Sequence, residues 1–423
     1  MISLPDRGTF VHRYPNGLVL LGEPMPWAES AAFTIAVPAG SGWDPADRSG
    51  LASVTCEMCL RGAGERDNRR FISDLESLGV EWSESVSAFH IRFSGACAAD
   101  VLPQALEVFA DVLRRPRLPK DELENARQGL LQDILSVEDD PADLARRELR
   151  RRFFPIPFNR PNEGEADHVR AVTWAEVREH YERHFRPNGT ILGVAGKFDW
   201  ERLRGHVGDL LADWPSREPP AVVETPRSAV VAHVDYPSQQ THIAVAYPSV
   251  PYDHPQYFEA VGTVGVLSGG MSARLLTEIR DKRGLCYSVH ASHRVRPNMG
   301  AVLCYSGTTA ERAQETLNVL LRELMRLKEG VLEEELDRLK SQYRTGLVMH
   351  QESSAARSAA VVTDWHLLGR TRPLAEIDQR VRELTTTALN RFLQENPPQS
   401  FTIVTVGPQP LEVPRDVLEA HAT

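Results

Sequence analysis

The segment from Gly50 to Gly64 reads GLASVTCEMCLRGAG, a mostly apolar stretch with glycines near both ends. Its interior suits a helix, and glycine is common at helix boundaries, so the pattern predicts a helix from about Gly50 to Arg61. Three of its side chains could carry chemistry, namely Ser53, Cys56 and Glu57. The helix is otherwise expected to be buried.

On either side of this segment, short strands with alternating polarity are mixed with long helices. The turn Pro15-Asn16-Gly17 joins the first two strands, and Gly79 follows a helix as a good terminating residue. Some strands adjoin in sequence and the helices are long, so we predict an α+β fold, with a mostly antiparallel sheet and helices packed on one side. The predicted strands are Phe10–Arg13, Leu18–Gly22, Phe33–Pro38, Trp82–Glu84, His90–Ser94 and Thr190–Ala195, and the predicted helices are Arg69–Leu78, Val101–Leu113, Lys120–Val137 and Thr173–His184.

The pattern of the first half returns in the second half. Five pairs of similar residues occur in the same order, separated by 208 to 213 positions: Ile35 and Ile243, Leu106 and Leu317, Glu122 and Glu335, Thr173 and Thr385, Ile191 and Ile403. Between the halves lies the proline-rich stretch ADWPSREPPAVVETPRS, which is typical of a semi-rigid spacer. The sequence therefore predicts two homologous domains, residues 1–211 and 229–423, joined by a linker over residues 212–228.

Composition limits the class of protein. The 423 residues carry a net charge of −10, which argues against a nucleic-acid surface, and the arginine-rich runs 114–117 and 147–152 are expected to be solvated helix faces. No apolar run is long enough for a membrane helix, and residues 1–17 do not resemble a secretory leader. Five cysteines, an odd number, fit a reducing compartment. We expect a cytoplasmic protein, plausibly bacterial, that binds neither nucleic acid nor membrane.

Three short patterns suggest chemistry but have simpler explanations. Cys56 and Cys59 form a CxxC pair, either a redox or metal pair or, as we favour, two buried helix residues. Ser53 has no adjacent histidine base to make it a nucleophile. His180 and His184 share a helix face, but neither residue 181 nor residue 183 is the glutamate that a zinc peptidase motif requires. We expect that helix to be structural.

The second half contains a longer motif, Ser268 to Val289, reading SGGMSARLLTEIRDKRGLCYSV. Gly284 is expected to end a helix that carries Arg280, so that Tyr287 begins a strand and the two side chains meet around the turn. A guanidinium can donate to peptide carbonyl groups, and a phenol can donate to a developing oxyanion. The alternative is that Arg280 caps the helix and Tyr287 packs in the sheet.

Both motifs resemble those of the insulinase/pitrilysin zinc metallopeptidase family, which includes the mitochondrial processing peptidase. That family's zinc helix reads G-x-A-H-x-x-E-H-M-x-F-x-G, and the first histidine, the catalytic glutamate and the second histidine are replaced here by Ser53, Cys56 and Glu57. The family's third ligand, a glutamate on a later helix, corresponds to Asp133. The resemblance therefore implies that this chain binds no zinc of its own.

The resemblance also implies a function. The C-terminal motif of the family is nearly intact here, and its substrate-contacting arginine and tyrosine correspond to Arg280 and Tyr287. We expect two metallohydrolase-like domains forming half of a clamshell. The predicted protein is a non-catalytic, substrate-binding subunit that pairs with a zinc-bearing paralogous subunit and encloses unfolded peptides. The alternatives are a peptide-binding scaffold without a peptidase partner, and a peptidase with an unusual site of its own.

Overall fold

The computed structural model describes residues 8–414 and Val417, so the first seven residues of the N-terminal stretch considered above lie outside it. The chain forms two compact units, neither of which is continuous in sequence. The first unit runs to Leu135 and adds residues 156–225 and 348–374. The second contains residues 136–155, 226–347 and the chain from Ala375 onward.

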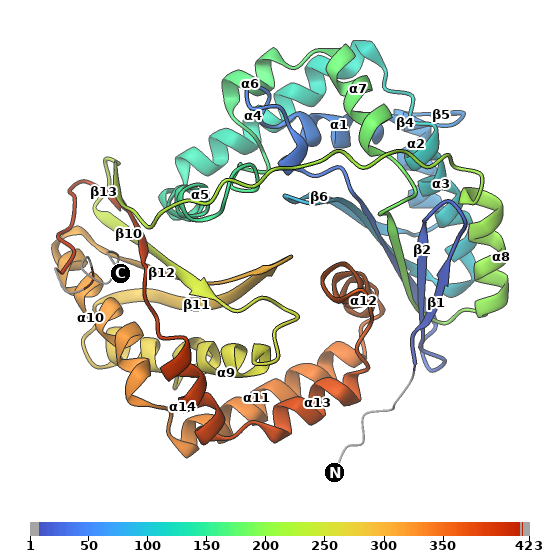
Figure 1. Ribbon diagram of the computed structural model, residues 1–423. Coiled ribbons are helices and arrows are strands. Elements are labelled where there is room, and N and C mark those ends of the chain that lie inside the picture. The colour runs from blue at the N-terminus through green and yellow to red at the C-terminus, as the bar shows by residue number, and fades with distance from the viewer. Residues whose placement is uncertain (1–7, 415–416, 418–423) are drawn as a thin grey trace. The chain divides into compact units, whose positions relative to one another are not determined.

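The first unit is built on a six-stranded sheet in the order β1-β2-β8-β3-β7-β6 (Figure 1). Strands β2 and β8 pair in parallel, and the other neighbours are antiparallel. One face packs on a large apolar core shared with the helices. The strands are β1 Phe10–Arg13, β2 Val19–Pro24, β3 Ser30–Val37, β6 Glu81–Val86, β7 Ile91–Ala98 and β8 Ile191–Gly196, with a small pair β4 Gly62–Ala63 and β5 Arg66–Asp67. The helices are α1 Leu51–Cys59, α2 Asn68–Ser77, α3 Leu102–Arg114, α4 Leu123–Asp139, α6 Ala166–Ala171, α7 Trp174–His184 and α8 Trp200–Leu211.

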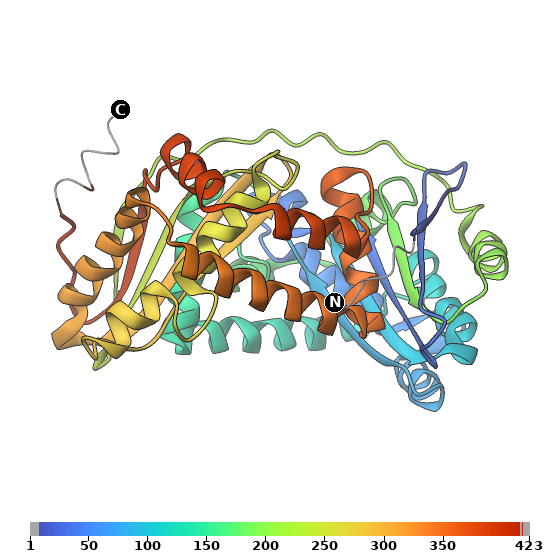
Figure 2. The ribbon, with the colours of Figure 1, turned by 90° about the horizontal axis from the view of Figure 1, so that it is seen from below.

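The second unit is built on a five-stranded sheet in the order β11-β12-β10-β13-β9. Strands β13 and β9 pair in parallel and the rest are antiparallel. Helices α9 and α10, yellow and orange in Figure 2, lie along this sheet and contact it. The strands are β9 Val231–Asp235, β10 Gln240–Ser249, β11 Cys286–Arg296, β12 Met299–Thr309 and β13 Thr402–Gly407, and the helices are α9 Tyr257–Ser268, α10 Ala313–Met325, α11 Glu333–Gln351, α13 Leu374–Glu383 and α14 Thr386–Glu395.

The two sheets share one five-strand topology, to which the first sheet adds β1. In each, one parallel pair is followed by three antiparallel neighbours, so that β2, β8, β3, β7 and β6 correspond to β9, β13, β10, β12 and β11. The predicted α+β class and the predicted duplication are therefore confirmed. The boundaries 1–211, 212–228 and 229–423 remain a prediction about the repeats, because the compact units divide the chain differently.

Each sheet has a second covered face, which the sequence did not predict. Helix α12 (Ser354–Leu368) packs on the first sheet, against residues such as Val19 and Ile191. Helix α5 (Pro141–Phe153) packs on the second sheet, against residues such as Ala244 and Val404. The first unit thus contains one helix from the second half of the sequence, and the second unit contains one helix from the first half.

The side-chain faces correct one of the repeat matches. Ile191 lies on the face covered by α12, whereas Ile403 lies in the main core of its unit. Adjacent residues of a strand point to opposite faces, so Ile191 and Ile403 cannot occupy equivalent positions. The correct alignment of the two strands differs from this match by an odd number of residues. The match of Ile35 with Ile243 is sound in this respect, because both point into the main core.

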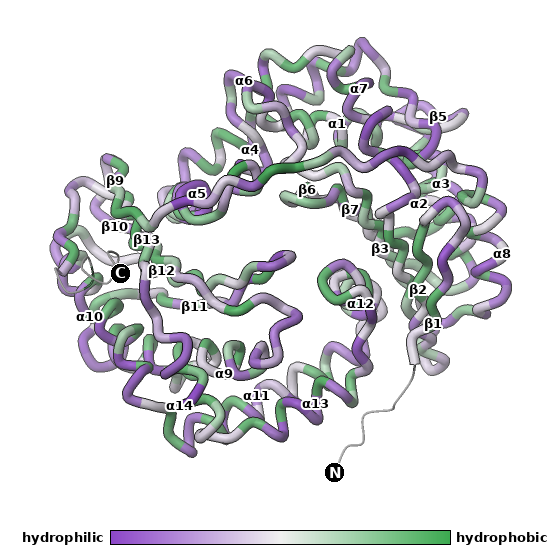
Figure 3. Tube along the Cα trace, viewed as in Figure 1, coloured by the Kyte–Doolittle hydropathy of each residue, from purple (hydrophilic) through white to green (hydrophobic). Residues whose placement is uncertain are grey.

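Hydropathy follows the layers. Figure 3 shows the strands of the first sheet largely in green, whereas α8 alternates between purple and green. That alternation is typical of a helix with one buried and one solvent-exposed face. Among the described residues, no helix combines the length and the apolar character needed to cross a membrane.

Candidate functional site

Helix α1 begins at a buried carboxylate. The backbone N–H groups of Gly50 and Ala52 donate to the two Asp44 oxygens, at 2.8 and 2.9 Å. These bonds satisfy two of the free donors at the helix N-terminus. Gly50 itself has φ 102°, a left-handed conformation that favours glycine. Burial nevertheless dominates at Asp44 and raises its pKa to about 7.

The Ser53 hydroxyl is engaged in structure. Its Oγ donates to the backbone oxygen of Asn162 at 2.6 Å, and the residue is 5% exposed. This position corresponds to the first histidine of the family's zinc motif. Here it joins α1 to the segment before α6.

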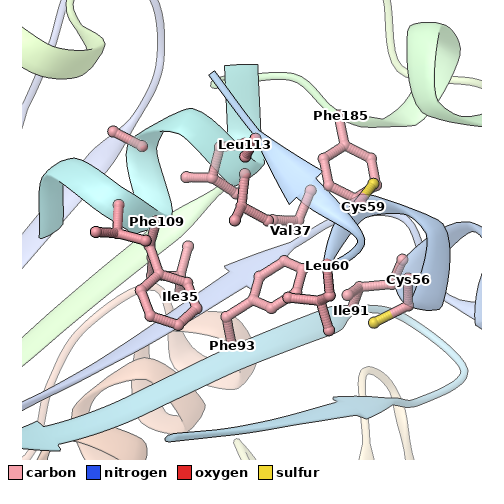
Figure 4. Packing of buried hydrophobic residues seen from close by; sticks show 14 of the residues in the cluster. Ile35, Val37, Cys56, Cys59, Leu60, Ile91, Phe93, Phe109, Leu113 and Phe185 are labelled. Carbon is pink, nitrogen blue, oxygen red and sulfur yellow. The ribbon is translucent and has the colours of Figure 1, made fainter. Parts of the chain in front are cut away.

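Cys56 and Cys59 are core residues. Both are buried and unlinked to another cysteine, and Figure 4 shows them inside the packed cluster that includes Leu60, Ile91 and Phe185. Burial raises the pKa of both thiols well above the ordinary value. A thiol held protonated in this way is a poor nucleophile and a poor metal ligand. The structure thus agrees with the packing explanation of the CxxC pair.

Glu57 is the one motif position on α1 that reaches solvent, with 35% of its side chain exposed. Burial raises its pKa first, then the charge of Glu84, while Arg61 at 3.9 Å opposes the shift and Asp133 adds to it. The structure therefore brings Glu57 and Asp133 into electrostatic range, as the motif spacing implied. Glu84 was not among the site residues predicted from the sequence, although it lies in the predicted strand Trp82–Glu84, now part of β6.

These residues do not fit a zinc ion. Tetrahedral zinc sites in proteins use three or four histidine, thiolate or carboxylate ligands. Ser53 is bonded to the backbone, Cys56 is buried as a thiol, and only Glu57 and Asp133 offer carboxylates. In the described part of the chain, no group of three or more histidine, cysteine or acidic side chains is arranged to hold a metal.

His180 and His184 form no zinc site either. Their ring centroids lie 4.4 Å apart, both residues are 4% exposed, and burial lowers their pKa values to about 4 and about 2. His180 Nε2 lies 3.3 Å from the oxygen of Ala39, and Glu182 pairs with Arg178 instead of facing the histidines. Helix α7 is structural, as predicted.

The Arg280–Tyr287 turn is built from two backbone irregularities. Arg280 lies on a π-helical turn, η4 (Leu276–Asp281), and Gly284, three residues after it, has φ 61°. Tyr287 is the extra residue of a β-bulge, because Cys286 pairs with Thr308 and Ser288 with Gly307. π-Turns and bulges redirect side chains and are frequent at functional sites.

The half-buried Arg280 side chain meets the exposed ring of Tyr287. The Arg280 guanidinium carbon lies 5.7 Å from the centre of the Tyr287 ring, and Tyr287 is 88% exposed. Tyr287 is therefore not packed in the sheet. The guanidinium of Arg280 has no hydrogen bond or ion pair with any residue that the structure describes.

The neighbouring basic residues of the same motif behave differently. Arg274 pairs with Glu335 at 2.6 Å, and Lys282 and Arg283 pair with Glu278 at 2.6 and 2.7 Å. Arg283, not Arg280, donates to a carbonyl of this helix, that of Glu278. Arg280 is thus free to donate to a peptide carbonyl, and the exposed phenol of Tyr287 can donate to an oxyanion.

Sequence comparison finds one family on both halves of the chain. Residues 20–157 match the model described as "Insulinase (Peptidase family M16)", and residues 171–343 match "Peptidase M16 inactive domain". An uncharacterized zinc protease of Mycobacterium tuberculosis is 26% identical over 407 residues, covering 93% of this chain and 92% of that protein. An uncharacterized zinc protease of Bacillus subtilis is 21% identical, with coverages of 93% and 97%.

Solved structures show the same fold. A structure titled as a peptidase M16 inactive domain from Pseudomonas fluorescens superimposes with a TM-score of 0.88 and 22% identity, covering 96% of this chain and all of that one. A protease from Helicobacter pylori superimposes with a TM-score of 0.86 and 18% identity, with the same coverages. At such identities the likeness establishes the fold and not the activity.

Proposed function

The chain belongs to the insulinase family of peptidases, peptidase family M16, and we propose that it is a non-catalytic, substrate-binding subunit of a heterodimeric zinc peptidase. A zinc-bearing paralogous chain would supply the metal and the general base. This chain would supply Arg280 and Tyr287 and help to enclose unfolded peptides. The observation that carries the proposal is the exposed, unpaired Arg280–Tyr287 turn in a chain whose own zinc positions are Ser53, Cys56 and Glu57.

The electrostatics of the two positions support this division of labour. Ser53 and Cys56 are buried and belong to the packed core, so that of the family's three ligand positions and its glutamate only Glu57 and Asp133 carry a carboxylate here. The hydrogen-bond donors of the Arg280 and Tyr287 side chains are not used by other residues in the described part of the chain. An exposed tyrosine also contributes little to folding stability. Acyl transfer is accelerated by preorganised hydrogen-bond donors that face the negative charge developing in the transition state.

The proposal is tested by mixing the chain with a zinc-bearing paralogue and following hydrolysis of an unfolded peptide. We expect Arg280→Ala and Tyr287→Phe to reduce kcat/KM about 100- to 1000-fold, the range for removal of a transition-state donor. Arg294→Ala is the matched control, since Arg294 is an exposed arginine on the same strand, β11. Unchanged hydrolysis with both variants would overturn the proposal.

The composition of the native complex distinguishes the alternatives. A complex with a zinc-containing chain at equal stoichiometry supports the proposal. A complex of this chain alone, without zinc, favours a peptide-binding scaffold. Near one equivalent of zinc in the isolated chain would instead indicate a peptidase with its own site.

We also propose a cytoplasmic location. All five cysteines are free and buried, and none pairs with another. Free thiols in an odd number suit a reducing compartment. Cell fractionation with an antibody against the chain tests this, and recovery outside the cytoplasm would contradict it.

A further inference from the structure

One end of the first sheet collects cationic and hydrogen-bond-donating side chains from five segments of the first unit. Arg186 lies between α7 and β8, His90 immediately precedes β7, and Arg92 lies on β7. His184 ends α7, and His366 comes from α12, the helix contributed by the other half of the sequence. Trp43 follows β3 in the loop before α1. We refer to these six residues as the cationic cluster.

Ring contacts connect the cluster. Trp43 lies 6.1 Å from His184, and His90 lies 4.3 Å from His366, measured between ring centroids. Phe89 bridges the two pairs, since its centroid is 6.5 Å from that of Trp43 and 5.6 Å from that of His366. Residues far apart in sequence thus surround one region with aromatic and cationic groups.

Several donors in the cluster are buried without a partner. The Nε atoms of Arg92 and Arg186, Nε1 of Trp43, Nδ1 of His184 and Nε2 of His366 have no hydrogen-bond partner. Arg186 and His184 are each only 4% exposed. The arginine and tryptophan atoms can only donate, whereas each histidine nitrogen can donate or accept. Buried polar groups are normally bonded, so a concentration of such atoms is unusual.

The two guanidinium groups also lack a counter-charge. In the described part of the chain, neither Arg92 nor Arg186 has a carboxylate oxygen within 4.0 Å, in contrast to the many arginines that do. The pKa of His90 is lowered by burial first, then by His366 and by both arginines, with no acidic group acting on it. Asp44, next to Trp43, is occupied by the first backbone N–H groups of α1.

We propose that the cationic cluster binds an oxyanion of the carboxylate or phosphate type. Buried charges in proteins are paired or ligated, and the guanidinium fork matches such oxygens in two-point contacts. Arg92 and Arg186 would supply the charge, and Trp43, His184 and His366 the neutral hydrogen bonds. The anion is either a free small ion or the carboxylate end of a peptide. The site lies within the first unit and does not depend on the proposed function.

The first test is calorimetric titration of the full chain with sodium phosphate and with sodium acetate, at constant ionic strength. We expect saturable binding in the wild type, and at least about tenfold weaker binding for Arg92→Gln and Arg186→Gln, since bonds to charged groups are lost. Arg183→Gln is the matched control, because Arg183 lies on α7 three residues before Arg186 but is exposed. Equal affinities in wild type, Arg92→Gln and Arg186→Gln, or no saturable binding in the wild type, would overturn the proposal.

Thermal unfolding supplies a second readout that does not require the variants to bind. In chloride buffer, Arg92→Gln should unfold at or above the wild-type temperature, because a partly buried charge without a carboxylate partner has been removed. In phosphate, the wild type should gain stability and Arg92→Gln should not. The same upward shift in both proteins would contradict the site.

A pair of peptides distinguishes the sources of the anion. One has a free C-terminal carboxylate and the other is its amide, so that only the first carries the proposed group. Competition with phosphate by the free acid alone would identify a peptide end as the ligand. Phosphate binding without competition from either peptide would identify a free ion.

Discussion

Helix α1 and the Arg280–Tyr287 turn are the two places where the family's motifs fall, and they differ in what their side chains contact. On α1, Ser53 bonds to a backbone oxygen and Cys56 is packed in the core. In the turn, Tyr287 is 88% exposed, and the Arg280 guanidinium lies over its ring. The first motif has become part of the folding core, and the second still presents chemistry to solvent.

The difference also appears in the backbone. Both regions have a left-handed glycine, Gly50 before α1 and Gly284 in the turn, but α1 itself is a regular helix whereas the turn combines a π-helical segment with a β-bulge. Irregular backbone conformations cost free energy, and they are concentrated at sites where they position a functional side chain. Helix α1 therefore keeps a regular backbone within the core, whereas the geometry of the turn directs an exposed side chain toward solvent.

The largest expected effect comes from restoring the family's glutamate on α1. Cys56→Glu places a carboxyl group in a buried site near Glu57 and Glu84, so we expect the free energy of unfolding to fall by about 3 kcal/mol or more. Urea denaturation measures this. The control Cys56→Ala should cost about 1–2 kcal/mol. If the two variants were equally stable, α1 would still be able to accept a catalytic carboxylate and the comparison would fail.

A smaller effect is expected at Gly284, which follows the π-turn. A Cβ there meets only an Arg312 nitrogen at 3.7 Å, so the cost of Gly284→Ala is the left-handed backbone itself, about 1–2 kcal/mol. Gly129→Ala is the control, because Gly129 is a helical glycine in open space and should gain up to about 1 kcal/mol. Thermal unfolding that ranks the two variants in the opposite order would show that the turn is not held in this conformation.

The next effect is on pH dependence at Glu57. Its folded pKa is raised, so the folded state binds the proton more tightly and stability falls as pH rises above about 4.5, the ordinary value. Glu57→Gln should therefore be more stable than wild type at pH 8 and lose that advantage near pH 4. Glu84→Gln should reduce the same dependence, because Glu84 is the larger neighbouring charge. Urea midpoints across this range measure it, and identical pH profiles in all three proteins would contradict it.

The smallest effect is the one that most sharpens the comparison. Tyr287→Ala should change the free energy of unfolding by no more than about 0.5 kcal/mol, since the side chain is exposed. Tyr247→Ala, at a tyrosine of β10 that is 5% exposed, should cost about 3 kcal/mol or more. A large loss at Tyr287 would assign it a structural role.

Much of the first half could be predicted because its signals are local. Phe10–Arg13 is strand β1 as predicted, and the predicted helix Arg69–Leu78 lies within one residue of α2, with Gly79 left-handed after it. The position of Ile403 could not be predicted, because a match between two strands does not show which face each residue occupies. Glu84 was not predicted for a similar reason. Nothing in the sequence distinguishes this exposed glutamate of a strand from any other, because its effect on Glu57 depends on α1 lying next to it in the fold.

The sequence by itself determined the duplication, the replaced zinc positions and the Arg280–Tyr287 motif, because each depends on residue identity and spacing. Only the tertiary structure shows that α5, from the first half of the sequence, packs on the second sheet. Likewise, only the structure shows that α12, from the second half, packs on the first sheet. The ion pair of Arg357 with Glu23 joins residues 334 positions apart, and no local pattern encodes such a contact. The exposure of Tyr287 and the cationic cluster have the same origin, because burial and charge balance are set by neighbours that only folding brings together.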